Sequence, residues 1–304
     1  MKIAVIMSTY NGEKYLTEQI DSILAQQNVD IELFIRDDGS IDKTVKIIMK
    51  YCEKYPNIHL EKGINIGFGQ SFMSELKKAK GFDFYAFSDQ DDYWEKEKLF
   101  SACNMVLNKG KNEQKPIVYY SNLNVADENL NIYRKTELEK RKHSIESVVM
   151  RRSIAGCTMV FNQAMWDCIN MKSTTDEMLR RGHDSFIISL CYAVGGEVLC
   201  DSNAYICYRQ HKSNTSGSSY GVLKRVKKEW NILINRKGAE SEIARSILEN
   251  WSRFIEKDNK KVLLIVSNSN EIGNRMKILM SGRFATGDLR LTLVGKFKVI
   301  TGLL

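Results

Sequence analysis

The sequence predicts an α/β protein built on a mostly parallel sheet, and two observations support this prediction. Short apolar runs alternate with segments of helical periodicity from residue 3 to residue 88, in the order β-α-β-α-β-α-β. This alternation requires right-handed crossovers between parallel strands. Each apolar run also ends in a polar, turn-forming cluster, and open α/β folds hold their ligands at the carboxyl ends of their strands.

The strands are expected at residues 3–8, 32–37, 58–61 and 82–88. Helical spacing of apolar residues covers residues 15–26 and 71–80, and Asp42 is a candidate N-cap for a further helix between them. The polar clusters at the strand ends are residues 8–11, 37–40, 65–67 and 89–92. Because parallel strands end at one edge of a sheet, these four clusters are expected to line a single ligand crevice.

The fourth cluster contains three carboxylates, Asp89, Asp91 and Asp92, at the end of a run of aromatic residues. Carboxylates this close repel one another unless a cation lies between them, and a hard divalent ion that also contacts phosphate oxygens suits them. The alternative is a helix N-cap, since Asp91 or Asp92 could cap a helix that begins near Glu95. A cap needs only one Asp, so the cluster favours a metal site.

The 304 residues suit one large or two modest domains. Residues 221–304 hold 17 Lys and Arg against 8 Asp and Glu, whereas residues 1–220 hold 28 against 29. We therefore expect a basic helical region over residues 221–304, preceded by a folded domain over residues 1–220 that we divide into halves at 1–115 and 116–220. The 7 Cys form no CxxC pair, which is typical of reduced core thiols in the cytoplasm.

Two glycine-rich motifs are absent from the sequence. They are G-x-G-x-x-G, which binds dinucleotides, and G-x-x-x-x-G-K-[ST], which binds nucleoside triphosphates. Three segments follow one another along the chain: Ser-Thr-Tyr-Asn-Gly (8–12), Asp-Asp-Gly-Ser (37–40) and Ser-Asp-Gln-Asp-Asp-Tyr-Trp (88–94). Together they resemble the ordered signature of family 2 glycosyltransferases of the GT-A fold. With Tyr-Arg-Gln-His (208–211), they are most similar to bacterial rhamnosyltransferases that build cell-surface polysaccharides.

The resemblance implies a nucleotide-sugar donor, dTDP-rhamnose or a UDP-sugar, and a divalent cofactor, Mn²⁺ or Mg²⁺. Ser8 and Tyr10 would border the base, Asp38 or its neighbour Asp37 would accept the N3–H of the base, and Asp89 would face the ribose. Asp91 would be a metal ligand. Asn65, in the cluster 65–67, and Trp94, two residues after the cluster 89–92, are also expected to contact substrate. Taken alone, Tyr10 could be a core or turn residue and residues 37–40 an ordinary Asp-Gly turn.

Inverting sugar transfer needs a base that deprotonates the acceptor hydroxyl. The resemblance assigns this role to Asp184, although on local grounds Asp184 could simply be the N-cap of the apolar helix that follows. His183 could orient the acceptor or could be a packed core histidine. His211 is a further candidate metal ligand or diphosphate partner, with a solvated loop histidine as the alternative.

The polar segment over residues 122–153 is expected to be a solvated helix or a loop over the site. In the basic tail, residues 222–233 and 288–304 combine apolar and basic positions, which fits an anionic membrane surface or, equally, a helical subdomain or homodimer interface. The predicted function is sugar transfer to a glycan or lipid-linked acceptor by a cytoplasmic protein, with peripheral attachment to the inner face of the membrane considered. Two other classes of function are considered: nucleic-acid binding through the tail, and a catalytically silent role in binding nucleotide sugars. Nucleic acid is not expected as a partner.

Overall fold

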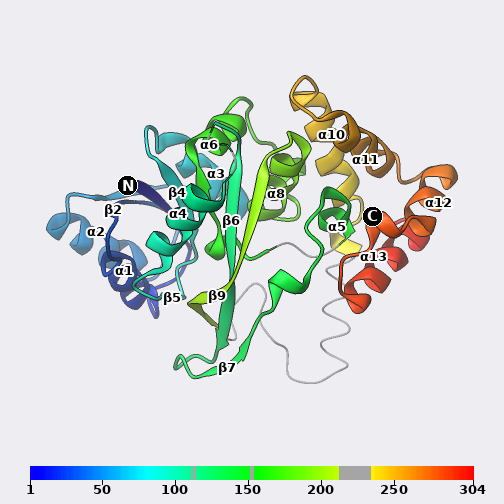
Figure 1. The fold of residues 1–304 in the computed structure, drawn as a ribbon. Coiled ribbons are helices and arrows are strands. Elements are labelled where there is room, and N and C mark those ends of the chain that lie inside the picture. Colours follow the sequence, from blue (N-terminus) through cyan, green and yellow to red (C-terminus); the bar gives the residue numbers. More distant parts are fainter. Residues whose placement is uncertain (111, 113, 151–153, 212–233) are drawn as a thin grey trace. The chain divides into compact units, whose positions relative to one another are not determined.

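The computed structural model describes residues 1–110, 112, 114–150, 154–211 and 234–304 (Figure 1). The chain forms two compact units, each assembled from separate segments. The first unit comprises Met1–Leu138, Ile154–Thr174 and Gly196–Arg209, and the second comprises Glu139–Ser153, Thr175–Gly195 and Gln210–Leu304. The domain boundary predicted at residue 220 and the helix predicted over residues 222–233 lie outside the described residues.

The beginning of the first unit has the predicted alternation of strands and helices. Its elements are β1 (Lys2–Thr9), α1 (Leu16–Leu24), β2 (Asp30–Asp37), α2 (Thr44–Lys54), β3 (Ile58–Lys62), α3 (Phe68–Lys78) and β4 (Phe84–Ser88). The four strands are parallel neighbours in the order β3-β2-β1-β4. The predicted α/β fold with parallel strands flanked by helices is confirmed.

The remainder of the first unit extends this sheet with strands of mixed direction. It contributes β5 (Tyr93–Trp94), α4 (Lys98–Lys109), β6 (Ile117–Ala126), β7 (Ile132–Lys135), β8 (Val160–Asn162), α6 (Gln163–Asn170) and β9 (Glu197–Arg209). The sheet continues from β4 in the order β8-β6-β9-β5, with β7 paired to β6. Strand β8 is antiparallel to β4 and β6, whereas β6 and β9 are parallel.

The register of the parallel strands brings their carboxyl ends to one edge. Thr9 at the end of β1 pairs with Asp37 at the end of β2, and Asp37 pairs with Lys62 at the end of β3. On the other side of β1, Met7 pairs with Ser88, the last residue of β4. The loops that follow these strands therefore start at the same level of the sheet, as the sequence predicts.

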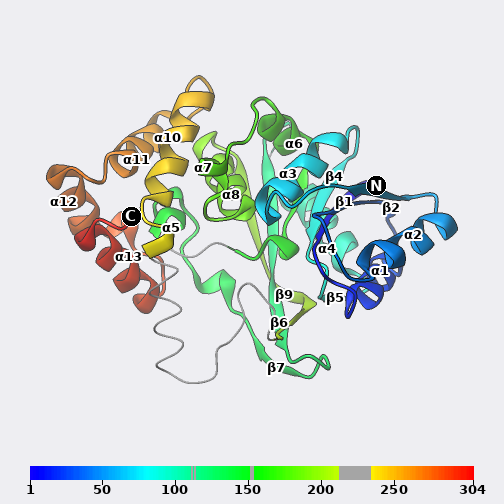
Figure 2. The same ribbon diagram turned by 180° about the vertical axis from the view of Figure 1, so that it is seen from behind.

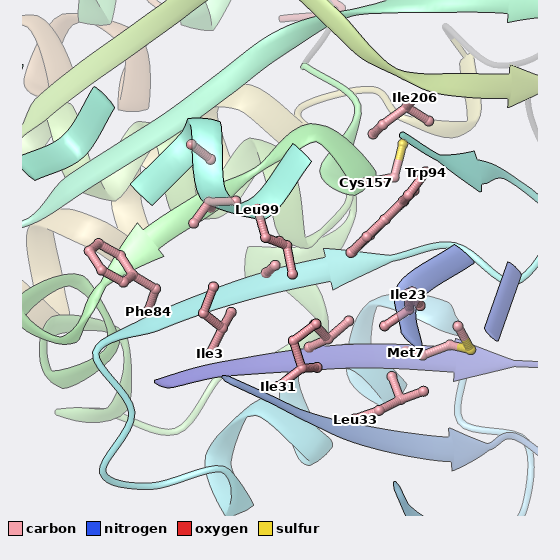
Figure 3. Packing of buried hydrophobic residues seen from close by; sticks show 14 of the residues in the cluster. Ile3, Met7, Ile23, Ile31, Leu33, Phe84, Trp94, Leu99, Cys157 and Ile206 are labelled. Carbon is pink, nitrogen blue, oxygen red and sulfur yellow. The ribbon is translucent and has the colours of Figure 1, made fainter. Parts of the chain in front are cut away.

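The core of the first unit holds this edge in place. Residues of β1, β2 and β4 point toward helices α1 and α4, and Figure 3 shows Ile3, Ile31, Phe84 and Leu99 in one apolar layer. Burial of each large aliphatic side chain contributes about 1.5–3 kcal/mol to folding. Strands β1 and β4 are buried on both faces, so successive side chains enter apolar layers on alternate sides of the sheet.

The second unit is helical in its described part (Figure 2). Its helices are α5 (Ile145–Met150), α7 (Asp176–Leu179), α8 (His183–Ala193), α10 (Ala239–Trp251), α11 (Lys257–Ser267), α12 (Ile272–Met280) and α13 (Leu289–Thr301). Helix α10 packs on α7, α8 and α11, while α5 packs on α8 and α13. Among the described residues, no helix combines the length and the apolar character needed to cross a membrane.

Two local expectations were wrong. Residues 122–150 are not one solvated segment, because β6 runs on to Ala126, β7 follows, and every residue of α5 is buried among neighbouring helices. The helix expected near Glu95 begins at Lys98, because Tyr93 and Trp94 pair with the end of β9 instead.

A buried ion cluster stabilises the second unit. Glu240 in α10 is 2% exposed, and its carboxylate lies 2.5 Å from Lys298 Nζ and 3.6 Å from Arg181 Nη1. Burial alone would raise the pKa of Glu240, but the two cations outweigh burial and hold the pKa below its ordinary value of 4.5. The ionised carboxylate therefore stabilises the folded state above pH 4.5, and this contribution is lost as the pH falls through the lowered pKa.

We expect Glu240→Gln to lower the free energy of unfolding at pH 7 by about 3 kcal/mol, because it leaves two buried cations without their counter-ion. Glu242→Gln in the same helix is the control, because its pair with Arg180 is partly exposed and should contribute less than about 1 kcal/mol. Urea unfolding of both variants at pH 7 and pH 3.5 gives the test. Equal losses in the two variants at pH 7, or a Glu240→Gln loss that does not shrink in acid, would contradict the prediction.

Candidate functional site

Asp37 ties the end of β1 to the loop after β2. Its carboxylate is buried and accepts hydrogen bonds from Thr9 Oγ1 at 3.0 Å, from Ser40 N at 2.9 Å and from Ser40 Oγ. Bonds from an Asp side chain to the backbone and hydroxyl three residues ahead are typical of an Asx-type turn. Asp37 therefore shapes the loop through its own carboxylate.

Asp38 forms a buried ion pair with Arg36, and both side chains are almost inaccessible to solvent. The Asp38 carboxylate also accepts the backbone N–H groups of Ile66 and Gly67, each at 2.9 Å. These bonds hold the loop after β3, in which Asn65 Oδ1 accepts Gly67 N at 3.2 Å. A carboxylate has about four acceptor positions, and three are used here, which leaves one for a donor such as the N3–H of a base.

Tyr10 presents an exposed ring on a fixed backbone. Its side chain is 48% exposed, while its backbone N–H donates to Gln90 Oε1 at 2.9 Å and its carbonyl accepts from Gln90 Nε2 at 3.1 Å. Gln90 lies in the acidic loop, so this two-way amide contact joins the ends of β1 and β4. Ser8, at the same edge, donates its hydroxyl to Ser71 Oγ at 2.7 Å. An exposed aromatic ring held in this way suits stacking on a flat ligand.

The acidic loop, residues 89–92, contains the most perturbed carboxylate of the first unit. Asp92 has no exposed surface; one oxygen accepts Arg209 N at 3.1 Å, and Oδ2 has no hydrogen-bond partner in the described part of the chain. Burial, followed by the charges of Asp89 and Asp91, raises the pKa of Asp92 well above its ordinary value. Negative charge gathered in this way is relieved by a nearby cation.

Asp92 belongs to a set of possible metal-ligand residues. Ligand atoms of Asp89, Asp92 and Cys157 lie within 4.8 Å of one another. The two carboxylates suit a hard divalent ion such as Mn²⁺ or Mg²⁺, whereas burial raises the pKa of the Cys157 thiol and so disfavours the thiolate that binds metal. The sequence indicated Asp91 and His211 as ligands and missed Cys157, because a buried Cys in an apolar run has no local metal signature.

Trp94 lies in the core and not on a ligand-facing surface. Its side chain has no exposed area, and Figure 3 shows it beside Cys157 and Ile206 at the end of the core. Lys98 Nζ is buried 3.4 Å from the centroid of the indole ring, and burial lowers the pKa of Lys98 to about 7. Trp94 therefore supports the acidic loop from beneath, which differs from the substrate contact that the sequence suggested.

Arg209 lies in the segment 208–211 that carries the resemblance, but no role was predicted for it. This buried side chain at the end of β9 donates from Nε to the carbonyl of Asp91 at 2.8 Å and from Nη1 to the carbonyl of Glu128 at 2.6 Å. It also pairs with Glu18 and lies 4.5 Å from the centroid of the Tyr15 ring. Arg209 thus fixes the backbone of the acidic loop, and a buried Arg with several fixed acceptors is well suited to that task.

The second unit contains the other predicted residues. Gly182 occupies the N-cap position of α8, with φ 105°, so Asp184 lies inside the first turn and is not the cap. Its carboxylate accepts Ser185 N at 2.7 Å, and the helix N-terminus favours its ionised form. His183 is buried, and burial lowers its pKa to about 3, so the ring is neutral. His211 is partly exposed. Whether these side chains meet the carboxylates of the first unit stays a prediction.

Gly12 tests the contact between Gln90 and Tyr10. A Cβ at Gly12 would lie 2.2 Å from Gln90 Oε1, so Gly12→Ala must displace the amide from the Tyr10 backbone. We expect Gly12→Ala and Gln90→Ala each to lower the free energy of unfolding by about 1 kcal/mol. The double variant should be no less stable than Gln90→Ala alone, because both changes remove one interaction. Chemical unfolding of the three variants gives the test, and fully additive losses would contradict this account.

Comparison with known structures supports the fold. The chain superimposes on a crystal structure of Staphylococcus aureus TarS in complex with UDP-GlcNAc with a TM-score of 0.61, 20% identity, and coverage of 100% of this chain and 82% of that one. A mannosyltransferase from Pyrobaculum calidifontis in complex with GDP-Man and Mn²⁺ gives a TM-score of 0.52 at 14% identity, covering 98% and 86%. These likenesses show a GT-A fold.

Sequence comparison gives the family. The dTDP-rhamnosyl transferase RfbG of Shigella flexneri is 29% identical over 245 residues, which span 74% of this chain and 80% of the relative. The model of "Glycosyl transferase family 2" matches residues 4–166, more than half of the chain and all four strand-end loops of the parallel sheet. This protein is therefore a glycosyltransferase and belongs to glycosyl transferase family 2.

Proposed function

We propose that the protein transfers a sugar, with inversion and with the help of a divalent metal, from a nucleotide diphosphate to a hydroxyl group of a growing glycan. The observation that best supports this proposal is the meeting of an exposed aromatic ring, Tyr10, and the acidic loop at the same edge of the sheet. The ring suits a nucleobase, and the loop suits the diphosphate with its cation. Both are parts of one donor molecule.

The residues present fit a divalent ion at the acidic loop. Asp89, Asp92 and Cys157 offer ligand atoms close together, and Asp91 and His211 are the further ligands proposed from the sequence. When bound, such an ion would neutralise charge on the leaving diphosphate. The chain itself would hold the loop in place through Arg209 and present the base-binding edge through Tyr10 and Asp38.

Asp184 is proposed as the general base. The acceptor hydroxyl oxygen would attack the anomeric carbon while its proton passes to the Asp184 carboxylate, and the bond from that carbon to the diphosphate would break. One feature supports this role: the carboxylate lies in the first turn of α8, where a helix N-terminus favours its ionised form. His183 next to it is buried and neutral, which fits the alternative of a packed core histidine.

The proposed donor is dTDP-rhamnose, and the proposed acceptor is a cell-surface polysaccharide or a lipid-linked glycan. The name of the relative RfbG, which matches along most of its length, supports this choice. A UDP-sugar is the alternative, supported by the TarS structure that holds UDP-GlcNAc. For either donor the pyrimidine base offers an N3–H to the remaining acceptor position of Asp38.

The donor is best identified by a thermal-shift panel of dTDP-rhamnose, UDP-GlcNAc, UDP-glucose and GDP-mannose, with and without Mn²⁺. A specific donor at 100 times its Kd stabilises the fold by about 2.7 kcal/mol, so the melting temperature should rise clearly for dTDP-rhamnose with Mn²⁺. GDP-mannose is the control, because its purine lacks the pyrimidine pattern. A shift with GDP-mannose alone would contradict the proposed donor, and no shift with any nucleotide would contradict donor binding.

The two carboxylates proposed for the reaction should differ in their effects. We expect Asp91→Asn to abolish transfer and to weaken donor binding in Mn²⁺, whereas Asp184→Asn should lower kcat by at least about 10² while donor binding stays unchanged. Asp176→Asn, in the first turn of the neighbouring helix α7, is the control and should retain full activity. Full turnover by Asp184→Asn would remove it as the base, and unchanged Mn²⁺-dependent binding by Asp91→Asn would remove it as a ligand.

A further inference from the structure

Two helices at the end of the second unit expose regular rows of large apolar side chains. On α12 the row is Ile272, Met276 and Met280, which repeat every four residues and are 80%, 48% and 78% exposed. On α13 the row is Leu289, Leu293, Phe297 and Ile300. The opposite sides of the helices are buried at Ile278 and Val299, so the helices already have a core to pack on. The exposed rows therefore need a different explanation from folding.

The same segment is strongly basic. Residues 272–304 contain six Lys and Arg and a single acidic residue, Asp288; of the six, Lys298 pairs with Glu240 and Arg283 with Glu146. The Asp288 side chain accepts Leu291 N at 3.1 Å as the N-cap of α13, so this acidic group serves the helix terminus. Lys277 and Arg290 are exposed beside the apolar rows, and Lys296 is partly exposed. Apolar rows flanked by cations are the pattern of helices that lie in the interface of an anionic bilayer.

A cavity next to α12 adjoins this surface. It has a volume of about 550 Å³ and is lined by apolar side chains of α11, α12 and the turn after α12, among them Val262, Ile265, Met276 and Phe284. Lys277 also lines it, as do Lys261, which pairs with Asp258, and Arg283, which pairs with the lining residue Glu146. The apolar part of this cavity fits an acyl chain. Figures 1 and 2 both show α11, α12 and α13 following one another at this end of the second unit.

We propose that the exposed rows of α12 and α13, with the adjoining cavity, bind an anionic lipid bilayer. Charge complementarity identifies the occupant: a second copy of this chain would bring two equally basic surfaces together, which repel. Single-stranded nucleic acid is also disfavoured, because the rows contain one aromatic residue, Phe297, and base stacking needs aromatic platforms. The proposal assigns membrane attachment to particular residues and does not depend on which sugar is transferred.

The test is co-sedimentation of the full chain with vesicles, without any nucleotide sugar. Wild-type protein should bind vesicles of phosphatidylcholine with 30% phosphatidylglycerol, bind pure phosphatidylcholine at least about tenfold more weakly, and lose affinity as salt rises. Leu293→Gln/Phe297→Gln should weaken binding by at least about tenfold, because it removes apolar area from the interface. Lys277→Gln/Arg290→Gln/Lys296→Gln should remove most of the preference for the anionic lipid.

The matched control is Ile132→Gln/Tyr133→Gln, which removes two exposed apolar residues from β7 in the first unit and should bind as wild type does. Circular dichroism and thermal midpoints check that the variants fold. No binding by the wild type, equal binding to both lipids, or unchanged binding by Leu293→Gln/Phe297→Gln would each overturn the proposal. Concentration-dependent self-association that this double variant abolishes would also overturn it, in favour of an interface between copies. Since no donor is present, these results are separate from those that test sugar transfer.

Discussion

The first unit depends on how buried charge is held at the carboxyl edge of its sheet. Asp37, Asp38 and Asp92 are all nearly inaccessible, and a buried carboxylate is tolerated only when it has partners. Asp38 forms an ion pair with Arg36 and accepts two backbone N–H groups, and Asp37 accepts hydrogen bonds from Ser40 in the turn that follows it. Asp92 is different, because only one of its oxygens is bonded. The loops are thus held by hydrogen bonds to Asp37 and Asp38, while Asp92 carries the buried charge that has the fewest donors of the three.

Much of this edge could be predicted from the sequence, for a physical reason. A strand buried on both faces is a continuous apolar run, and its end is marked by the first polar cluster. The ends of β1, β2, β3 and β4 were therefore visible, and parallel pairing made them neighbours. Arg209 could not be found in this way, because its partner Asp91 lies 118 residues away in the chain. Cys157 was missed for the same reason, since only the fold places it beside Asp92.

Local composition also misled where tertiary packing decided the outcome. The segment that contains α5 is highly charged, so its average predicts a solvated segment, yet Ile145, Val148 and Val149 bury the helix among its neighbours. Trp94 follows an acidic motif and was expected to contact substrate, but its pairing with β9 turns it into the core. In both cases a few apolar residues outweighed the pattern around them, because burial contributes more than local propensity.

The residues proposed for donor recognition and the proposed base lie in different units of the fold. The strand-end loops that would recognise a donor all lie within residues 4–166, the part that matches the family, whereas Asp184, His183 and His211 lie beyond it. The positions of residues in a donor site built on strand ends are fixed by the register of the sheet. A shift of one strand would move its loop and the loops of the strands paired with it. The proposed base, Asp184, lies in the first turn of a helix whose N-cap is Gly182, and its carboxylate accepts Ser185 N. The donor site would thus be limited by the sheet, while the residues on the helical unit could change with the acceptor.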